Sequence, residues 1–128
     1  MTELTDEELL RYARQVLLND WDMEAQLRLK AARVVIIGAG GLGCPAAETL
    51  ARAGVGHITM IDNDVIEASN LQRQTLFVAA DIGDSKAERA AKRLTEINPY
   101  IEAIGIQARL SDDNAATWLK SEAAFPGY

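Results

Sequence analysis

The chain has 128 residues, of which 48% are hydrophobic and 25% are charged, and its formal net charge at pH 7 is -6. This length fits one domain and is short for a complete six-stranded dinucleotide-binding fold. The negative charge argues against binding to nucleic acid or to an anionic membrane, because both depend on clustered lysine and arginine. With neither a signal peptide nor an apolar run near the ~20 residues of a membrane span, we expect a cytoplasmic protein.

Residues 1–32 are predicted to form an amino-terminal arm of two helices. Thr5 and Glu8 have the spacing of a capping box, and apolar residues recur at helical spacing over 7–18 and again over 23–32. The apolar stripe of such an arm must be buried, either on its own domain or on a partner subunit. Arg14 follows Arg11 by one helical turn, and spacing alone favours a solvated Arg14 over a phosphate contact.

The chain is organised around a β-branched strand that runs into a glycine-rich turn. Val34–Ile37 predicts a strand buried on both faces, as in a parallel sheet. Gly38, Gly40 and Gly43 then form a G-x-G-x-x-G pattern before a predicted helix, with Gly41 as an additional glycine. Such glycines allow a tight turn, a close approach of phosphate to backbone, and packing of helix on strand. The unpaired N–H groups that open the helix favour an anion.

A second strand, predicted over residues 57–61, is followed by Asp62. Its position after the glycine pattern is close to the ~20-residue separation expected for the carboxylate that binds a ribose hydroxyl. Strand, helix and acid in this order favour nucleotide binding over a glycine-rich structural turn. Cys44 is interpreted as a small packing residue rather than a reactive thiolate, and His57, the only histidine, as a turn residue.

A polar segment, residues 63–74, follows Asp62 at the end of the sheet where open α/β folds bind ligands. Within it, Asp64 can assist a metal ion. The donors that can fold over phosphates are those of Asn70, Arg73 and Gln74. From this segment alone, a surface loop with a short helix capped by Ser69 is the simpler interpretation.

The next helix is predicted within residues 81–98, after a turn at Gly83, with a cap at Asp84 or Ser85 and an end before Pro99. Lys86 lies in its first turn, where a cation opposes the helix dipole unless an anion is nearby. This local conflict favours a phosphate-binding Lys86 over a solvated one. The other cations of the helix are predicted to form a solvated face: Arg89, Lys92 and Arg93.

A third strand is predicted over residues 101–106 and a last helix, capped by Ser111, through Trp118 and Leu119. No fourth strand is predicted in the tail, residues 121–128. The pattern therefore predicts an α/β, Rossmann-like three-layer fold that is partial, with about three parallel strands over residues 33–120, preceded by the helical arm.

Five phrases, RYARQ, GAGGLG, GVGHITMIDND, SNLQRQ and GDSKAERA, occur in an order and spacing typical of one family. The chain resembles the amino-terminal half of the MoeB/ThiF/HesA family, adenylyltransferases related to ubiquitin-activating enzymes. The resemblance implies ATP and Mg²⁺ as cofactors, a homodimer, and a role in molybdopterin or thiamine biosynthesis. It also implies that the C-terminal glycine of a small ubiquitin-like sulfur-carrier protein, MoaD- or ThiS-like, is activated as an acyl-adenylate.

The resemblance also implies roles for individual residues. Gly41 would lie at the phosphates, Asp62 would hold the ribose, and Arg14 would reach the triphosphate bound by the other subunit. The other nucleotide contacts would be Ser69, Asn70, Leu71, Gln72, Arg73 and Lys86. As catalytic residues, Arg14, Arg73 and Lys86 would offset the repulsion between a carboxylate and the triphosphate.

The chain departs from the family pattern after its third strand. The magnesium-binding aspartate of the family and its paired CxxC zinc ligands come later, so the ligands of a structural zinc are absent here. We therefore expect the ATP-binding part only, with Val34–Ile37 on an open sheet edge that favours self-association. Two alternatives are a noncatalytic fragment that binds nucleotide or a partner and, less favoured, half of an NAD-dependent dehydrogenase.

Overall fold

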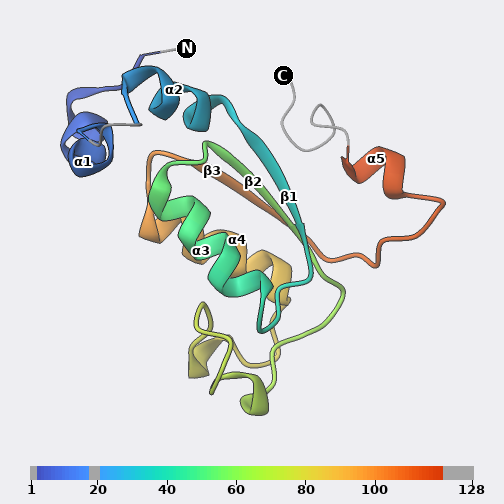
Figure 1. The fold of residues 1–128 in the computed structure, drawn as a ribbon. Helices are drawn as coiled ribbons and strands as arrows, with labels where there is room; N and C mark the ends of the chain where they lie inside the picture. The colour runs from blue at the N-terminus through green and yellow to red at the C-terminus, as the bar shows by residue number, and fades with distance from the viewer. Residues whose placement is uncertain (1–2, 18–20, 120–128) are drawn as a thin grey trace.

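A computed structural model describes residues 3–17 and 21–119 of the chain (Figure 1). The helices are α1 (Asp6–Val16), α2 (Met23–Ala31), α3 (Gly43–Ala53), α4 (Lys86–Ile97) and α5 (Ala115–Leu119). The strands are β1 (Arg33–Ile37), β2 (His57–Ile61) and β3 (Glu102–Ile106), and two 3-10 turns are η1 (Ala68–Asn70) and η2 (Ala79–Asp81). The predicted tail, 121–128, lies outside the described residues.

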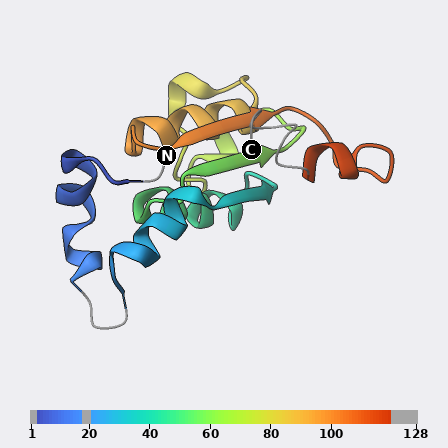
Figure 2. The same cartoon turned by 90° about the horizontal axis from the view of Figure 1, so that it is seen from above.

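The three strands form a parallel sheet in the order β1-β2-β3. Ile37 pairs with Ile61 and Ile61 with Ile106, so the carboxyl ends of the strands meet at one edge. Figures 1 and 2 show α3 and α4 together on one face of the sheet, while the segment 62–85 extends beyond the carboxyl ends. This arrangement confirms the predicted Rossmann-like fold.

The core lies between β2 and the two helices on its face. Ile58 and Met60 are fully buried against Ala47 of α3 and Leu94 of α4. Helix α4 approaches β3 so closely that a Cβ on Gly105 would lie 2.2 Å from the carbonyl oxygen of Ala87. The absence of a side chain at Gly105 therefore fixes the position of α4 and of the residues at its amino end.

The outer strand differs from the prediction. All five residues of β2 are buried, whereas β1 is half-buried and Ile37 is 54% exposed. A strand buried on both faces is thus wrong for β1, because β1 is the edge of the described sheet. His57 is also not a turn residue: it is the buried first residue of β2, and its Nδ1 lies 3.3 Å from the Ala32 carbonyl oxygen.

The arm is packed on its own domain. Helix α1 begins with the predicted capping box, in which Thr5 and Glu8 exchange side-chain to backbone hydrogen bonds of 3.0 and 3.1 Å. The buried Tyr12 accepts a hydrogen bond from Asn98 Nδ2 (2.8 Å), and the same amide donates to the Ala51 carbonyl (2.7 Å). The arm therefore packs on its own domain, which is one of the two locations predicted for it.

Helix α2 contributes a second contact to the carboxyl end of α3. Gln26 is fully buried and donates to the Ala53 carbonyl (2.8 Å), while its Oε1 accepts from Gln15 and Trp21. The carbonyls of Ala51 and Ala53 lie in the last turn of α3, where no further helical N–H groups follow to donate to them. The arm therefore satisfies the end of α3, which closes at Gly54 in the left-handed conformation.

The last helix begins later than predicted. The N–H of Ser111 donates to Asn114 Oδ1 (2.8 Å), and the Ser111 carbonyl accepts from the N–H of Ala115 (2.9 Å). Ser111 thus opens a turn, and its hydroxyl does not cap α5. Within residues 3–17 and 21–119, no helix has the length and hydropathy that a membrane crossing needs.

The predicted solvated face of α4 is partly wrong. Arg93 donates to the buried Asp81 carboxylate (3.0 Å) and to the Leu76 carbonyl (3.0 Å), and Arg89 donates to Asp84 (2.8 Å). These bonds hold the segment 76–84 against α4, and only Lys92 is exposed as expected. The contacts of Arg93 escaped the prediction because Asp81 and Leu76 lie 12 and 17 residues earlier in the sequence.

Candidate nucleotide-binding site

The glycine-rich corner between β1 and α3 has one tight turn and one open side. Gly38 adopts φ +95°, which favours glycine, and a Cβ on Gly43 would lie 1.8 Å from the Gly38 carbonyl oxygen. At Gly40 and Gly41, in contrast, the nearest atoms stand 3.8 and 4.0 Å from the position of a Cβ. Two glycines therefore build the corner, and the two between them leave it open.

The open side carries unpaired backbone donors. The N–H groups of Gly38 and Ala39 are bonded to the Ile61 carbonyl (2.8 Å) and to Asp62 (2.8 Å). For Gly40, Gly41 and Leu42, the described part of the chain contains no acceptor for the N–H. These donors precede α3, whose dipole favours negative charge at this end, so the corner has the chemistry of an anion site.

Asp62 connects this corner to the segment after β2. Its Oδ2 accepts from the Ala39 N–H (2.8 Å) and its Oδ1 from the Asp64 N–H (2.7 Å), and each oxygen retains a lone pair for another donor. A hollow of about 220 Å³ lies beside it, where Gly38 and Asp62 face Arg109 and Leu110. The predicted ribose-binding acid therefore lies at the carboxyl edge of the sheet, next to a cavity.

A second hollow, of about 260 Å³, contains the predicted lysine. It is lined by Asp64, Val65, Glu67, Asn70 and Lys86. Lys86 is only 7% exposed, its N–H donates to the Asp64 carbonyl (3.1 Å), and in the described residues its ammonium forms no hydrogen bond or ion pair. Because burying a charge without a partner is costly, a lysine in this state favours an anionic ligand.

The polar segment positions its residues differently from the sequence prediction. Asn70, not Ser69, caps the amino end of the short helix η1, since its Oδ1 accepts from the Glu67 N–H (2.9 Å). Ser69 and Gln72 are exposed, whereas Leu71 is half-buried and packs against the core. Leu71 therefore has no polar side-chain group to offer a ligand, only its carbonyl and the exposed part of its apolar side chain.

The two predicted arginines lie in different places. Arg73 is exposed, and its Cδ and Nε stand 4.0 Å from the Cβ position of Gly41, so its side chain borders the open glycine corner. Arg14 is exposed on α1, which lies at the amino ends of the strands, opposite the corner (Figure 1). Within one chain, the structure thus brings the corner, Asp62, Asp64, Asn70, Arg73 and Lys86 to one end and leaves Arg14 at the other.

Cys44 has the packing role that the sequence predicts. It is fully buried, and burial raises the pKa of its thiol to about 11, which keeps it protonated. Its Sγ donates to the Ala39 carbonyl oxygen (3.2 Å) inside the glycine corner. A reactive thiolate is therefore not part of this site.

Sequence reasoning missed several residues that line the hollows. Ile37 and residues 108–110 border the cavity at Asp62, and Glu67 borders the one at Lys86. The signal was available for 108–110, because they follow β3 and the carboxyl ends of parallel strands share one edge. The sequence named Gln74 as a donor, but it did not show that Gln74 is buried.

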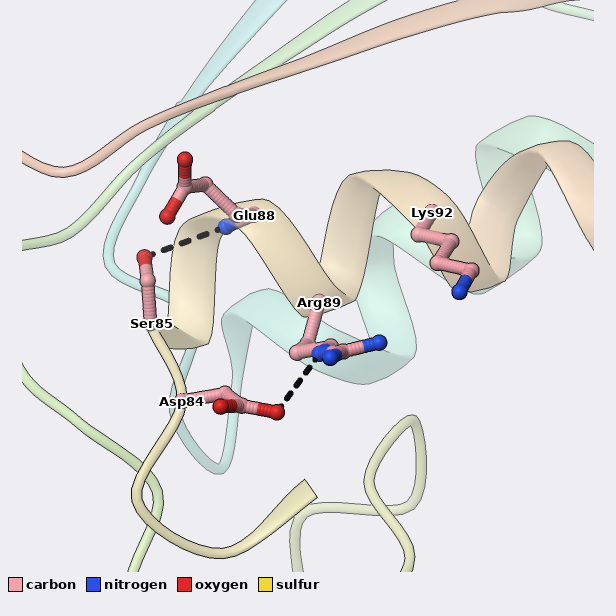
Figure 3. A pocket seen from close by; sticks show the side chains of 5 residues that line it. All are labelled: Asp84, Ser85, Glu88, Arg89 and Lys92. Atoms are coloured by element: carbon pink, nitrogen blue, oxygen red, sulfur yellow. Dashed lines mark hydrogen bonds and ion pairs between the residues drawn. The ribbon is translucent and has the colours of Figure 1, made fainter. Parts of the chain in front are cut away.

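A third hollow lies away from this site. It occupies about 280 Å³ beside the first turns of α4 and is lined by Asp84, Ser85, Glu88, Arg89 and Lys92 (Figure 3). Ser85 caps the helix by accepting from the Glu88 N–H, as one of the two predicted caps, and Asp84 holds Arg89. Because no residue of the glycine corner lines it, and the ion pair between two of its lining residues, Asp84 and Arg89, is internal to the hollow, it is not the candidate site.

The described residues do not form a metal centre on their own. Among them, no group of three or more His, Cys, Asp or Glu side chains is placed to hold a metal ion. Asp64 therefore lacks the protein ligands that a dedicated site requires, and Mg²⁺ at this position stays a prediction.

The domain is Rossmann-like and suited to an anionic nucleotide. It has a parallel sheet, and at one edge of that sheet lie an open glycine corner and a buried lysine without an ionic partner among the described residues. Residues 12–124 match the family described as the ThiF family, and the chain belongs to that family. This confirms the resemblance found in the sequence motifs.

Named relatives agree. The chain is 51% identical over 113 residues to a molybdopterin-synthase adenylyltransferase of Salmonella typhimurium, covering 88% of this chain and 45% of that protein. It is 49% identical over 116 residues to the Escherichia coli protein of the same name, covering 91% and 47%. The crystal structure of E. coli tRNA N6-threonylcarbamoyladenosine dehydratase, TcdA, in complex with ATP has a TM-score of 0.82 and 32% identity, covering 89% of this chain and 46% of that one. The chain spans about half the length of these two curated relatives.

Proposed function

We propose that this chain is the ATP-binding part of an adenylyltransferase that activates the C-terminal carboxylate of a small ubiquitin-like sulfur-carrier protein. The observation that carries the proposal is the buried Lys86, whose ammonium has no ionic partner in the part of the chain that the structure describes and which lies at the same edge as the open glycine corner. Relatives named molybdopterin-synthase adenylyltransferases and a neighbour in complex with ATP support it. The proposed protein is cytoplasmic.

In this proposal the nucleotide lies along the carboxyl edge of the sheet. The N–H groups of Gly40 and Gly41 hold phosphate oxygens, and Asp62 accepts from the ribose hydroxyls beside the 220 Å³ hollow. Asn70 and Lys86 bind from the neighbouring hollow. The exposed side chains of Ser69 and Gln72 and the backbone of Leu71 complete this side.

The reaction joins two anions, so the protein's contribution is mainly positive charge in fixed positions. A carboxylate oxygen of the carrier attacks the α-phosphorus, the bond to the pyrophosphate oxygen breaks, and an acyl-adenylate and pyrophosphate result. Lys86 and Arg73 offset the repulsion as the two groups meet, as in phosphoryl transfer. Arg14 lies too far from the corner in its own chain, so its proposed contact requires a homodimer in which α1 of one subunit faces the site of the other. Mg²⁺ would neutralise phosphate charge, with Asp64 the one acid here proposed to assist it.

The alternatives differ in ligand. Half of an NAD-dependent dehydrogenase would use the glycine corner and Asp62 but has no evident use for Arg73 and Lys86. A noncatalytic fragment would bind ATP or a partner without forming an acyl-adenylate. Membership of the ThiF family favours ATP over a dinucleotide.

The test is equilibrium binding of ATP and NADH to this chain, measured by calorimetry. We expect binding of ATP in preference to NADH. We expect Lys86→Ala to weaken ATP binding at least about tenfold, roughly 1.4 kcal/mol, because it removes a charge-assisted contact in a poorly solvated hollow. Lys92→Ala, an exposed lysine two turns along the same helix, is the matched control and should bind ATP as the unchanged chain does.

Preference for NADH, or equal ATP affinity of Lys86→Ala and Lys92→Ala, would contradict the proposed site. Pyrophosphate exchange, measured with the chain and a candidate carrier protein, then separates the two remaining functions. Exchange that depends on the carrier indicates an adenylyltransferase, and ATP binding without exchange indicates the noncatalytic alternative for this chain.

A further inference from the structure

Gln74 is a buried residue whose amide oxygen, Oε1, has no hydrogen-bond donor among the described residues. The residue is 2% exposed, and no donor in the described part of the chain reaches its Oε1. Its backbone is fully used, since its N–H donates to the Asn70 carbonyl (2.9 Å) and its carbonyl accepts from the Phe77 N–H (3.2 Å). Burying an amide without partners costs free energy, and such groups are rare in native proteins. The Oε1 of Gln74 is therefore a buried polar atom to which the described residues supply no hydrogen bond.

The amide of Gln74 faces the glycine corner. Its Nε2 is the nearest atom to the Cβ position of Gly40, at 3.8 Å. The preceding residue, Arg73, approaches Gly41 in the same way, at 4.0 Å. Two successive side chains thus cross from the polar segment to the two glycines that leave the corner open, and neither glycine has a side chain that would fill the space between.

The two side chains differ in what they can do there. Arg73 is long, exposed and charged, so it attracts an anion without fixing its position. The Gln74 amide is neutral and packed in place, and its NH₂ group can donate to an oxygen seated against the corner. A rigid donor of this kind orients a ligand more than it attracts one. The free N–H groups of Gly40 and Gly41 and the α3 dipole supply the attraction.

We propose that Gln74 is a further phosphate-binding residue, whose Nε2 donates to an oxygen of the ATP polyphosphate held at the glycine corner. The inference rests on the proposed function, since it requires that ATP binds there. It assigns Gln74 to orientation of the phosphates, beside the charge of Arg73 and Lys86. On ATP binding, the Nε2 donor of Gln74 gains an acceptor, whereas the unsatisfied Oε1 is itself an acceptor and gains nothing from a phosphate oxygen.

The test compares two substitutions of Gln74 in the 128-residue chain, with ATP as the ligand in calorimetry. Gln74→Met keeps the length of the side chain and removes its donors, and Gln74→Glu keeps the shape but replaces the donor by a negative charge. We expect ATP affinity to fall about five- to tenfold in Gln74→Met and further in Gln74→Glu. Thermal melting without ATP should place Gln74→Met at or above the unchanged chain, because replacing an unpaired buried amide by an apolar group of similar shape is neutral or stabilising.

The outcomes distinguish a phosphate-binding Gln74 from a purely structural one. Unchanged ATP affinity in Gln74→Met overturns the inference, and a lower melting temperature or loss of folding in that variant assigns Gln74 to the fold instead. If the unchanged chain binds no ATP, the proposed function itself fails. If the unchanged chain binds ATP and Lys86→Ala weakens it while Gln74→Met does not, only the inference about Gln74 fails.

Discussion

Glu8 and Lys86 are both buried charged residues, but only Glu8 has an ionic partner among the described residues. Glu8, 3% exposed, is paired with Lys30 at 2.8 Å and accepts from the Thr5 N–H. Lys86 is 7% exposed and, within residues 3–17 and 21–119, has no such partner. A neutralised buried charge is a structural contact, and an unneutralised one is a position prepared for a ligand. This contrast at the residue scale separates the arm from the candidate site.

The pairing of Glu8 predicts a pH-dependent contribution to stability. Burial alone would raise the pKa of Glu8, but hydrogen bonds and the charge of Lys30, together with the Thr5 backbone, hold it below the ordinary 4.5. A carboxyl whose pKa is lowered by folding stabilises the protein fully at pH values above its ordinary, unfolded-state pKa. The contribution disappears as the pH falls through the folded-state pKa. We expect Glu8→Gln to lower the free energy of unfolding by about 1–2 kcal/mol at neutral pH, with the difference shrinking below pH 4.5.

Urea unfolding followed by circular dichroism, at about pH 7 and about pH 3, measures this difference. Glu24→Gln is the matched control, because Glu24 pairs with Arg28 at the surface, where both side chains are well exposed. Its expected effect is below about 0.5 kcal/mol at either pH. A loss in Glu8→Gln that is the same at both pH values would show that the charge of Glu8 is not its cause.

At the scale of elements, the two ends of α3 carry different tasks. Its amino end follows three N–H groups without acceptors in the described chain, next to the open glycines. Its carboxyl end is covered by the arm, where Asn98 and Gln26 donate to the Ala51 and Ala53 carbonyls. Fixing one end holds the helix so that the other can present its dipole to a ligand.

Asn98 is the clearest test of that anchor. Its fully buried amide donates to both Tyr12 and Ala51 and accepts from the Tyr100 N–H. Asn98→Ala removes all three bonds and leaves buried polar groups unpaired, so we expect a loss of about 2–4 kcal/mol in denaturant unfolding. The control is Asn114→Ala, which also loses amide bonds to backbone, but at an exposed turn, and should cost less than about 1 kcal/mol. Equal losses in the two variants would contradict a special role for the α3 anchor.

The elements that the sequence predicted well depend on local chemistry. The Thr5 capping box, the turn at Gly38 and the acid after β2 all depend on neighbours a few residues away. They could therefore be derived from spacing and backbone preference. The existence and order of β1, β2 and β3 followed from the same patterns.

The features that escaped prediction depend on partners distant in sequence. Arg93 was assigned to a solvated face because its acceptor, Asp81, lies 12 residues earlier on a separate turn. The Tyr12 and Asn98 contact spans 86 residues. Gln74 could be noted as a donor, but only the fold shows that its amide is buried, unpaired and beside Gly40. Burial and long-range pairing are decided by the packing of elements, which spacing does not record.

At the scale of the whole molecule, the described sheet has an open edge at β1. The strand is hydrogen-bonded to β2 on one side, and within the described residues no strand lies on its other side. It is composed of β-branched residues after Arg33, and Ile37 is 54% exposed. An apolar parallel edge of this kind is a template for another strand.

We expect this chain by itself to associate through that edge, with an average mass that rises with concentration in sedimentation velocity without nucleotide. Ile37→Lys places a charge at the end of the edge strand and should shift the distribution toward monomer, because charged residues on edge strands oppose strand pairing. Leu10→Lys is the control for added charge, since Leu10 is 81% exposed on α1, at the opposite end of the sheet. A chain that stays monomeric at every concentration would contradict edge pairing, and an equal response to Leu10→Lys would assign the association to net charge or to the arm.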